Sequence, residues 1–419
     1  MASYPSALLR DVCASVEYGY TASSTPDPLV GPRFLRITDI VPERLDWDSV
    51  PFCEIEPKKL AKHRLHTGDI VVARTGATTG WAKYINNPPN AVFASYLVRL
   101  RPSASVDARY VGFVVESSVY KEFIQQHMGG AAQPNANAQV LTSFEIPLPP
   151  LPIQRRIAGI LSAYDELIEN SQRRIKILES MARALYREWF VHFRFPGHES
   201  VPRVPSSLGE IPQGWAVSKL GEHLDALESG KRPKGGIREV ENGVPSIGAE
   251  NINGIGQHDF AGEKFIPREF FQEMRKGVVR DRDVAIYKDG AYIGKSSYFR
   301  DGFPHVECCV NEHVFLLRAS GVRLKQNALY LWLQEPETVQ TIRSKNANAA
   351  QPGINQQTVG GLELILPSPE IATQFDELVD PLFAEVINLS KKTQNLRRTR
   401  DLLLPRLLSG QIDVDAMPS

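Results

Sequence analysis

The chain has 419 residues, which is long enough for two or three separate hydrophobic cores. Hydrophobic residues make up 42% of it and charged residues 23%, as in an ordinary globular protein rather than a disordered one. Its 48 basic residues balance its 48 acidic residues, which excludes a protein that coats nucleic acid nonspecifically.

The sequence shows neither a membrane segment nor a secretion signal. No apolar run reaches the ~18 residues that a membrane helix needs, and the first residues lack the basic and apolar regions of a signal peptide. The four cysteines, Cys13, Cys53, Cys308 and Cys309, have no CxxC spacing. We therefore expect reduced thiols and a cytoplasmic protein.

The pattern of residues 1–152 predicts a compact α+β domain. Short runs with strand-like alternation occur at residues 34–38, 69–74 and 96–100, and residues 110–126 have helical periodicity. Residues 199–370 show the same order, with strand-like runs at 283–287 and 314–317 and a helical segment at 329–344. The sequence therefore predicts two similar domains.

The chain also repeats itself at the level of individual residues. The tetrapeptide Ala-Ala-Gln-Pro occurs at residues 131–134 and again at 349–352, an offset of 218. Pro149 and Pro367, and Asn170 and Asn388, share that offset. An internal repeat of this length indicates a duplicated unit.

Each predicted domain is followed by a predicted long helix, which we call a spacer helix. The first spans residues 153–198, and the second lies in residues 371–419 together with a C-terminal tail. Apolar residues recur in steps of three and four with one extra four-residue step, a heptad pattern with a stutter. Two such helices favour an antiparallel coiled coil, although a helix hairpin buried in one core is the alternative.

The expected helix-helix packing residues are the apolar members of this pattern. In the first spacer helix they are Ile157, Ile160, Tyr164, Ile168, Ile175, Leu178, Leu185 and Trp189, and in the second Phe375, Leu378, Leu382, Val386, Leu389, Leu396 and Leu403. We expect Pro381 to kink or restart the second helix, and Pro405 to end or bend its last turn.

Several short motifs together resemble a known family. Residues 148–154 read LPPLPIQ, residues 188–193 read EWFVHF, residues 211–215 read IPQGW, and residues 403–410 read LLPRLLSG. In this order they resemble the specificity subunit of type I restriction-modification systems, and the resemblance covers essentially the whole chain.

This resemblance implies a fold and a role. It implies two target-recognition domains, residues 1–152 and 199–370, separated by the spacer helices, each recognising one half of a bipartite, asymmetric DNA site. It further implies a bacterial or archaeal complex with two adenine-N6 DNA methyltransferase subunits, which bind S-adenosylmethionine, and with restriction subunits that translocate and cleave DNA. No cofactor is expected in this chain itself.

The residues show no catalytic motif. There is no P-loop and no HExxH, and Gly76 and Gly80 are too sparse for a dinucleotide turn. His63 and His66 lie close in sequence without further ligands, so a surface pair is expected rather than a metal site. We therefore expect a DNA-recognition subunit that is not an enzyme; a protein-interaction scaffold without DNA readout and a nucleic-acid enzyme remain the alternatives.

Base recognition needs forked hydrogen-bonding side chains, and three loops in each domain supply them. In the first domain the candidates are Tyr20, Thr21 and Ser23, then Arg74, Thr75, Thr78 and Thr79, then Gln133 and Asn135, with Arg36 as a weaker candidate. In the second they are Lys231, Arg232 and Lys234, then Lys288, Asp289, Tyr292 and Lys295, then Gln351 and Asn355, with Asn251 as the weaker one.

The second loop is the most informative, because a constant frame carries variable polar residues. Asp69, Gly76 and Gly80 recur as Asp283, Gly290 and Gly294 at an offset of 214, whereas Arg74 becomes Lys288 and Thr75 becomes Asp289. We expect constant structural residues with changed polar residues between them in two domains that recognise different DNA sequences. The alternatives are a hairpin tip that has drifted, a solvated basic turn at 229–236, and amides that only cap turns in the third loop.

If the spacer helices set the distance between the half-sites, lengthening them should change the target. We expect that adding one heptad to both helices lengthens the preferred spacer between the half-sites, because seven residues add about 10 Å of helix. Sequencing the DNA bound by the altered complex measures the spacer. An unchanged spacer would show that the helices do not set the distance.

Overall fold

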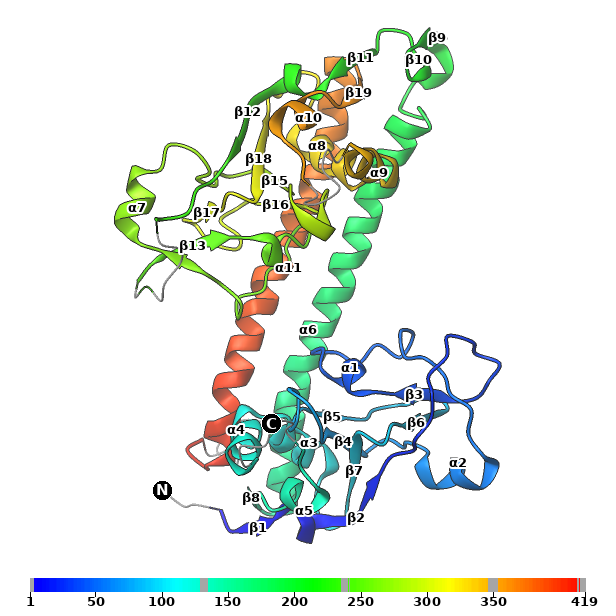
Figure 1. The fold of residues 1–419 in the computed structure, drawn as a ribbon, viewed down its shortest axis with the longest axis vertical. Coiled ribbons are helices and arrows are strands. Elements are labelled where there is room, and N and C mark those ends of the chain that lie inside the picture. Colours follow the sequence, from blue (N-terminus) through cyan, green and yellow to red (C-terminus); the bar gives the residue numbers. More distant parts are fainter. Residues whose placement is uncertain are drawn as a thin grey trace. The chain divides into compact units, whose positions relative to one another are not determined.

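The computed structural model describes residues 4–128, 135–234, 240, 242–345, 353–412 and 414. The chain forms two compact units, shown in Figure 1. Unit one comprises Met1–Glu166 with Arg397–Ser419, and unit two comprises Leu167–Leu396. Each unit therefore holds one of the two predicted domains together with a part of both long helices.

Unit one is built on a four-stranded antiparallel sheet. Its strand order is β2 (Cys13–Tyr18), β7 (Leu97–Pro102), β4 (Ile70–Ala73) and β5 (Ala82–Tyr84). Strands β3 (Arg33–Leu35) and β6 (Ala91–Phe93) form a separate parallel pair, and β1 (Ser6–Leu8) pairs with β8 (Glu145–Pro147).

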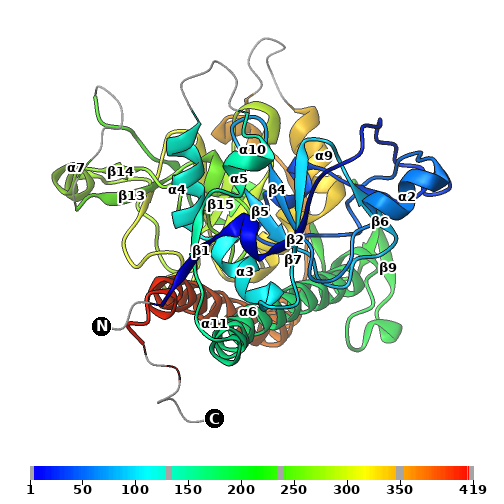
Figure 2. The same ribbon diagram turned by 90° about the horizontal axis from the view of Figure 1, so that it is seen from below.

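Short helices surround this sheet. They are α1 (Ile37–Ile40), α2 (Pro57–His63), α3 (Ala108–Glu116), α4 (Ser118–His127) and α5 (Ala138–Leu141). Helix α3 contacts β5 and β7, and α5 contacts β2 (Figure 2). Both faces of the sheet are covered: on β4, Ile70 and Val72 belong to the core that includes α3 and α4, and Val71 belongs to a second core with Leu35 and Phe93.

Unit two repeats this topology. Its four-stranded sheet has the order β12 (Leu224–Ser229), β18 (Val314–Ala319), β15 (Val284–Tyr287) and β16 (Ser296–Tyr298). Strands β13 (Val244–Ile247) and β17 (Cys309–Val310) form the parallel pair, and β11 (Ala216–Lys219) pairs with β19 (Glu363–Leu366). Helices α8 (Gln326–Gln334), α9 (Pro336–Ser344) and α10 (Gln356–Gly360) take the places of α3, α4 and α5.

Unit two also has a hairpin of β9 (Arg203–Ser206) and β10 (Gly209–Pro212) before its sheet. Helix α7 (Arg268–Glu273) lies between β13 and β15 in chain order, as α2 lies between β3 and β4. Strand β14 (Phe265–Ile266) pairs with β13, and in unit one Phe52 makes an isolated bridge to Arg33 of β3. The predicted α+β fold with an internal repeat is thus confirmed.

The two long helices are α6 (Leu151–Tyr186), which continues through a wider helical turn at Arg187–Val191, and α11 (Pro369–Leu408). In unit one, the start of α6 lies beside the end of α11, where Asp165 Oδ1 pairs with Arg400 Nη1 at 2.8 Å. In unit two, Phe190 near the end of α6 packs on Phe375 near the start of α11, with ring centroids 4.6 Å apart. Within each unit the pairing is therefore antiparallel, as the heptad patterns predict.

The prediction of a restart at Pro381 or an end at Pro405 is wrong, because α11 is continuous through both residues. A proline inside a helix removes one hydrogen bond and costs about 3 kcal/mol. Pro381 and Glu377, whose carbonyl loses its partner, both lie on the exposed side of α11. Water can satisfy that carbonyl, while the buried Val379 and Phe383 hold the helix against unit two.

The expected packing residues lie as follows. The buried ones are Ile157, Ile168, Ile175, Trp189, Phe375, Val386 and Leu389; the half-buried ones are Ile160, Tyr164, Leu178, Leu185, Leu382, Leu396 and Leu403. Leu378 differs, because 49% of it is exposed. Val379 and Phe383 take the buried places beside it, so a strict heptad register misplaces the contact face in this stretch.

Three other predicted elements need correction. Residues 110–126 and 329–344 each form two helices, because Ser117 Oγ accepts a hydrogen bond from Tyr120 N–H at the start of α4 and Pro336 opens α9. The strand predicted at 34–38 ends at Leu35, and Ile37 begins α1. Among the helices of the described residues, none is long and apolar enough to cross a membrane.

Removing the ring of Phe375 should destabilise unit two. Phe375 is fully buried between Tyr186, Trp189 and Phe190, so Phe375→Ala should lower the free energy of unfolding by about 3–5 kcal/mol. Leu378→Ala, three residues further along the same helix, is the control and should cost less than about 1 kcal/mol because that side chain is half exposed. Urea unfolding followed by tryptophan fluorescence compares the two. Equal losses would contradict this assignment of the packed face.

Candidate functional site

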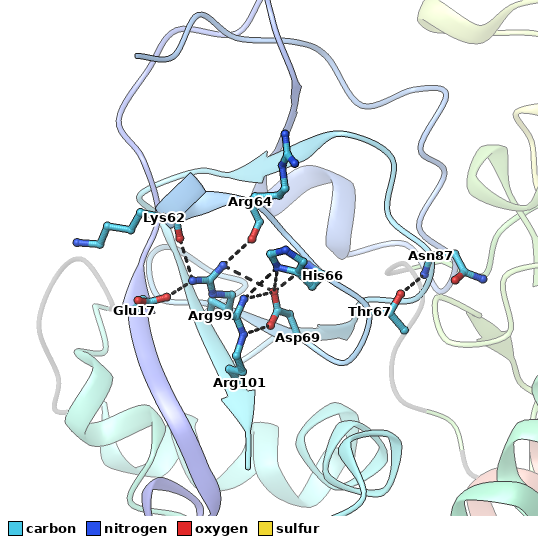
Figure 3. Close-up of polar contacts among 9 residues, drawn as sticks. All are labelled: Glu17, Lys62, Arg64, His66, Thr67, Asp69, Asn87, Arg99 and Arg101. Atoms are coloured by element: carbon cyan, nitrogen blue, oxygen red, sulfur yellow. Dashed lines mark hydrogen bonds and ion pairs between the residues drawn. The ribbon is translucent and has the colours of Figure 1, made fainter. Parts of the chain in front are cut away.

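A buried carboxylate at the start of the central strand organises each unit. In unit one, Asp69 precedes β4, and its carboxylate accepts hydrogen bonds from Arg101 Nε at 2.8 Å and from the N–H of His66 at 2.9 Å (Figure 3). Arg101 lies on β7, so the ion pair ties together the neighbouring strands β4 and β7.

The guanidinium of Arg99 lies buried beside this ion pair. It donates to the carbonyl oxygens of Arg64 at 2.7 Å and Lys62 at 3.0 Å, and it pairs with Glu17 on β2 (Figure 3). Burial, and then the nearby Arg101, lower the pKa of Arg99 to about 10, so that it stays protonated at neutral pH. Hydrogen bonds from a buried cation to carbonyls of the segment before β4 hold that segment against the sheet.

Unit two contains the same arrangement with one arginine fewer. Asp283 precedes β15 and accepts from Arg318 Nε at 2.7 Å and Nη2 at 2.8 Å, while Glu228 on β12 pairs with Arg318 Nη1 at 3.0 Å. Burial raises the pKa of Asp283, and the hydrogen bonds with Arg318 oppose that shift. The two carboxylates that recur in the sequence therefore hold equivalent strands in both units.

The loops that follow β4 and β15 are shaped by glycines at equivalent positions. Residues 76, 80, 290 and 294 all have positive φ, a conformation that other residues adopt at a cost. Each loop is tied by its backbone to a second loop: Ala136 N–H donates to Arg74 O, and Ile354 N–H donates to Lys288 O, both at 2.9 Å. A bridge between Thr75 and Asn135 recurs between Asp289 and Gly353.

In unit one, three loops meet around Arg74. The guanidinium lies over the ring of Tyr18, 5.0 Å from its centroid, and Nη2 donates to Asn135 Oδ1 at 3.1 Å. The Tyr18 hydroxyl accepts from the N–H of Ala138 at 3.0 Å. Tyr18 and Asn135 are exposed, so this cluster presents one guanidinium, one amide and one phenol at the surface.

The equivalent surface of unit two carries a chain of contacts between acidic and basic side chains. Asp289 Oδ2 lies 2.8 Å from His313 Nδ1, His313 Nε2 lies 3.2 Å from Glu312, and Glu312 pairs with Arg232 Nε at 3.0 Å. In the loop after β15, Lys295 Nζ lies 4.4 Å from the ring centroid of the exposed Tyr292. The frame is therefore the same in both units, and the chemistry that it presents is different.

The remaining candidate residues are placed on or beside these loops. Thr21, Ser23, Lys231 and Lys234 are exposed, Tyr20, Thr75 and Thr78 are half-buried, and Lys288 Nζ lies 4.9 Å from the ring centroid of Phe315. Arg36 forms a bidentate ion pair with Asp39, which holds its guanidinium on α1. Gln133 and Gln351 lie outside the described residues.

Two candidates are buried and hydrogen-bonded to the backbone. Thr79 is 1% exposed, and its hydroxyl donates to Gly76 O at 2.7 Å inside the loop. Asn251 is 2% exposed, and its amide donates to Asp259 O at 3.0 Å. Polar side chains in turns often form hydrogen bonds with nearby backbone groups. At these two positions such a hydrogen bond turns the side chain inward.

Asn137 and Asn355 in the third loops cap helices, which is the alternative role that the sequence allowed for these amides. Asn137 Oδ1 accepts from Val140 N–H at the start of α5, and Asn355 Oδ1 accepts from Thr358 N–H at the start of α10. Both are helix N-caps at equivalent positions. Asn135, two residues before the first cap, is the amide that contacts Arg74 instead.

Sequence reasoning missed Tyr18, Tyr96 and His313. Tyr96 is 50% exposed, and its carbonyl accepts from Arg74 N–H, just as the carbonyl of His313 accepts from Lys288 N–H. Tyr96 and His313 are 217 residues apart, and each lies directly before one of two equivalent strands. This equivalence could have been found in the sequence. His63, predicted as a surface residue, instead lies between the rings of Tyr20 and Phe93 with its Nδ1 2.9 Å from Lys59 O.

Comparisons with known proteins agree on one family. Residues 52–180 match the model of the type I restriction modification DNA specificity domain. The MjaIX specificity subunit of Methanocaldococcus jannaschii is 24% identical over 84% of this chain and 80% of its own length, and the HindI specificity subunit of Haemophilus influenzae is 24% identical over 86% and 91%. The crystal structure of the S subunit from M. genitalium has a similar fold, with a TM-score of 0.58 and 16% identity over 97% of this chain and 96% of that one.

The end of β12 leaves no room for a side chain at Gly230. A Cβ atom there would lie 1.5 Å from Val310 O, so Gly230→Ala should destabilise unit two by about 1–3 kcal/mol. The control is Gly159→Ala in α6, where a Cβ meets nothing within 4 Å and the better helix propensity should be neutral or gain up to about 1 kcal/mol. Thermal unfolding of both variants measures the difference. A Gly230 variant as stable as the unaltered chain would refute the close approach.

Proposed function

We propose that the chain is a specificity subunit of a type I restriction-modification system, the family to which its matches point, and that each unit recognises one half of a bipartite, asymmetric DNA site. The observation that carries the proposal is that the loops after β4 and β15 have the same backbone arrangement but carry different polar side chains. Matching backbone hydrogen bonds hold the frame in place, while Arg74 and Asn135 in one unit correspond to Lys288 and Gly353 in the other.

The surface of unit one suits the readout of a purine. Arginine pairs with the O6 and N7 atoms of guanine, and asparagine pairs with the N6 and N7 atoms of adenine. Arg74 is held by the ring of Tyr18 and the amide of Asn135, so it loses little conformational freedom on binding. Thr21 and Ser23 are exposed on the loop that begins beside Tyr18 and are proposed to contact sugar or phosphate.

The surface of unit two suits a different base pattern. Asp289, bonded to His313, is an acceptor for the N4 amino group of cytosine, and Lys288 and Lys295 are donors for guanine. Lys231 and Lys234 lie on the neighbouring loop and are exposed, which suits contacts with phosphate. Because Asp289 replaces Thr75 and Lys288 replaces Arg74, the two units would read unlike sequences.

We propose that the chemistry belongs to partner subunits. In this view two DNA methyltransferase subunits, each with S-adenosylmethionine, modify adenines at the site that this chain selects, and restriction subunits cleave unmodified DNA. The equal numbers of basic and acidic residues support such partners, because DNA phosphates then need cations from elsewhere. The proposal places the complex in the cytoplasm with the cell's DNA.

The direct test is the sequence that the assembled complex selects. The chain is expressed with its methyltransferase partner, and methylated adenines are mapped across the host genome. A bipartite motif with two unlike halves is expected. If the complex assembles but neither modifies nor enriches any sequence from a random duplex library, the chain is a protein-interaction scaffold instead; methyl transfer by the purified chain alone would show that it is an enzyme.

Substitutions at equivalent tips should affect one half-site each. Arg74→Ala should relax the choice of base in one half and Lys288→Ala in the other, each lowering discrimination at the affected position by roughly 10-fold, since a good base contact contributes about 1–3 kcal/mol. The measurement is enrichment of each half-site from a random duplex library by the complete complex.

A matched cation away from the loops controls for the lost charge. Arg268 lies on α7 of unit two and pairs with the exposed Glu307, so Arg268→Ala should leave both half-sites unchanged. If Arg74→Ala and Lys288→Ala each weaken both halves equally, the assignment of one half-site to each unit is wrong.

A further inference from the structure

Three potential metal ligands converge in unit two, on loops other than those assigned to DNA. His258 Nε2 lies 2.5 Å from Glu263 Oε1, and His305 Nε2 is within hydrogen-bond distance of the same oxygen. The three ligand atoms lie within 4.8 Å of one another. Among the described residues this is the one group of histidine, cysteine and carboxylate side chains that meets such a criterion.

The group is enclosed rather than scattered over a surface. The side chains of His258 and Glu263 are 1% and 9% exposed, and that of His305 is 26% exposed. Phe260 packs against both imidazoles, with ring centroids 4.6 Å from His258 and 5.7 Å from His305. A buried carboxylate needs compensation, and the ion pairs of Glu263 among the described residues are with these two imidazoles alone.

Two anchored loops bring the ligands together. His258 and Glu263 lie in the segment between β13 and β14, where the Asp259 carboxylate accepts from the N–H groups of Ala261 and Gly262 and turns the chain back. His305 lies between β16 and β17, in a loop that begins at the buried Arg300, whose Nη1 pairs with Asp380 on α11 at 3.1 Å. The ligands are therefore held by the fold before any ion arrives.

The ligand set matches the chemistry of one class of ion. Two imidazole nitrogens and one carboxylate oxygen are ligands of Zn²⁺, which binds them at about 2.0–2.2 Å in a tetrahedron with water at the fourth position. Three atoms already within 4.8 Å of one another need shifts of an ångström or so to reach such a tetrahedron. Mg²⁺ and Ca²⁺ prefer oxygen ligands and fit this set poorly.

We propose that His258, Glu263 and His305 form a zinc site that fastens the loop between β13 and β14 to the loop between β16 and β17. Zinc would take the place of the contacts between the two Nε2 atoms and Glu263, and each imidazole would bind it as the neutral tautomer whose proton is on Nδ1. The site belongs to unit two alone, because the equivalent loop of unit one, residues 85–90, reads INNPPN and has no histidine.

The test uses the full chain without a histidine tag, stripped with a chelator and dialysed against a small excess of zinc sulfate. Elemental analysis should find about one zinc per chain, and the unfolding temperature should rise on adding zinc. His258→Ala and His305→Ala should each lose the bound zinc and the zinc-dependent rise. His223→Ala is the matched control: His223 bonds Ser218 elsewhere in unit two, and its variant should keep one zinc.

Cobalt keeps the proposal testable if a variant fails to fold. Co²⁺ added to the stripped unaltered chain should give the intense visible absorption of a tetrahedral site, and zinc should displace it. Failure of the unaltered chain to retain zinc, or a weak octahedral cobalt spectrum, would overturn the proposal. Retention of one zinc by the folded His258→Ala and His305→Ala variants would overturn it as well.

Discussion

The pairing of a buried aspartate with an arginine on the neighbouring strand is the interaction on which both units depend. Asp69 with Arg101, and Asp283 with Arg318, hold the residue just before a central strand to the strand beside it. A buried charge that loses its partner costs about 3–5 kcal/mol, so neither residue can change alone. Because this contact sets the position of the strand, it also sets where the loop at the strand's far end emerges.

Because these ion pairs fix the strands, the side chains at the tips of the following loops can vary. Arg74 and Lys288 leave equivalent strands in the same way, and the hydrogen bonds that position them are made by their backbone atoms. A side chain at such a position can change without disturbing the backbone of the loop. Two domains that recognise different DNA sequences require this property. The loop between β16 and β17 carries His305, whereas the equivalent residues 85–90 of unit one contain no histidine, so variation is not confined to the loop tips.

The sequence predicted the large elements well and the inward or outward direction of single side chains poorly. Strands β4, β7, β15 and β18 and both long helices were evident, because alternation and heptad spacing extend over many residues. The burial of Thr79 and Asn251 was not evident, because a polar residue in a turn has the same sequence pattern whether it faces solvent or bonds the backbone. His258, Glu263 and His305 gave no signal, since ligands on two separate loops have no characteristic spacing.

Unit one is closed by the end of α11 and the segment after it. Leu407 and Val414 are buried in the same core as Leu9 and Ile70, so this core is completed only after residue 414 has been made. On the ribosome, the N-terminal unit must wait through the synthesis of all of unit two before its apolar face is covered. A chain that terminates before Leu407 would therefore expose that face to chaperones and proteases.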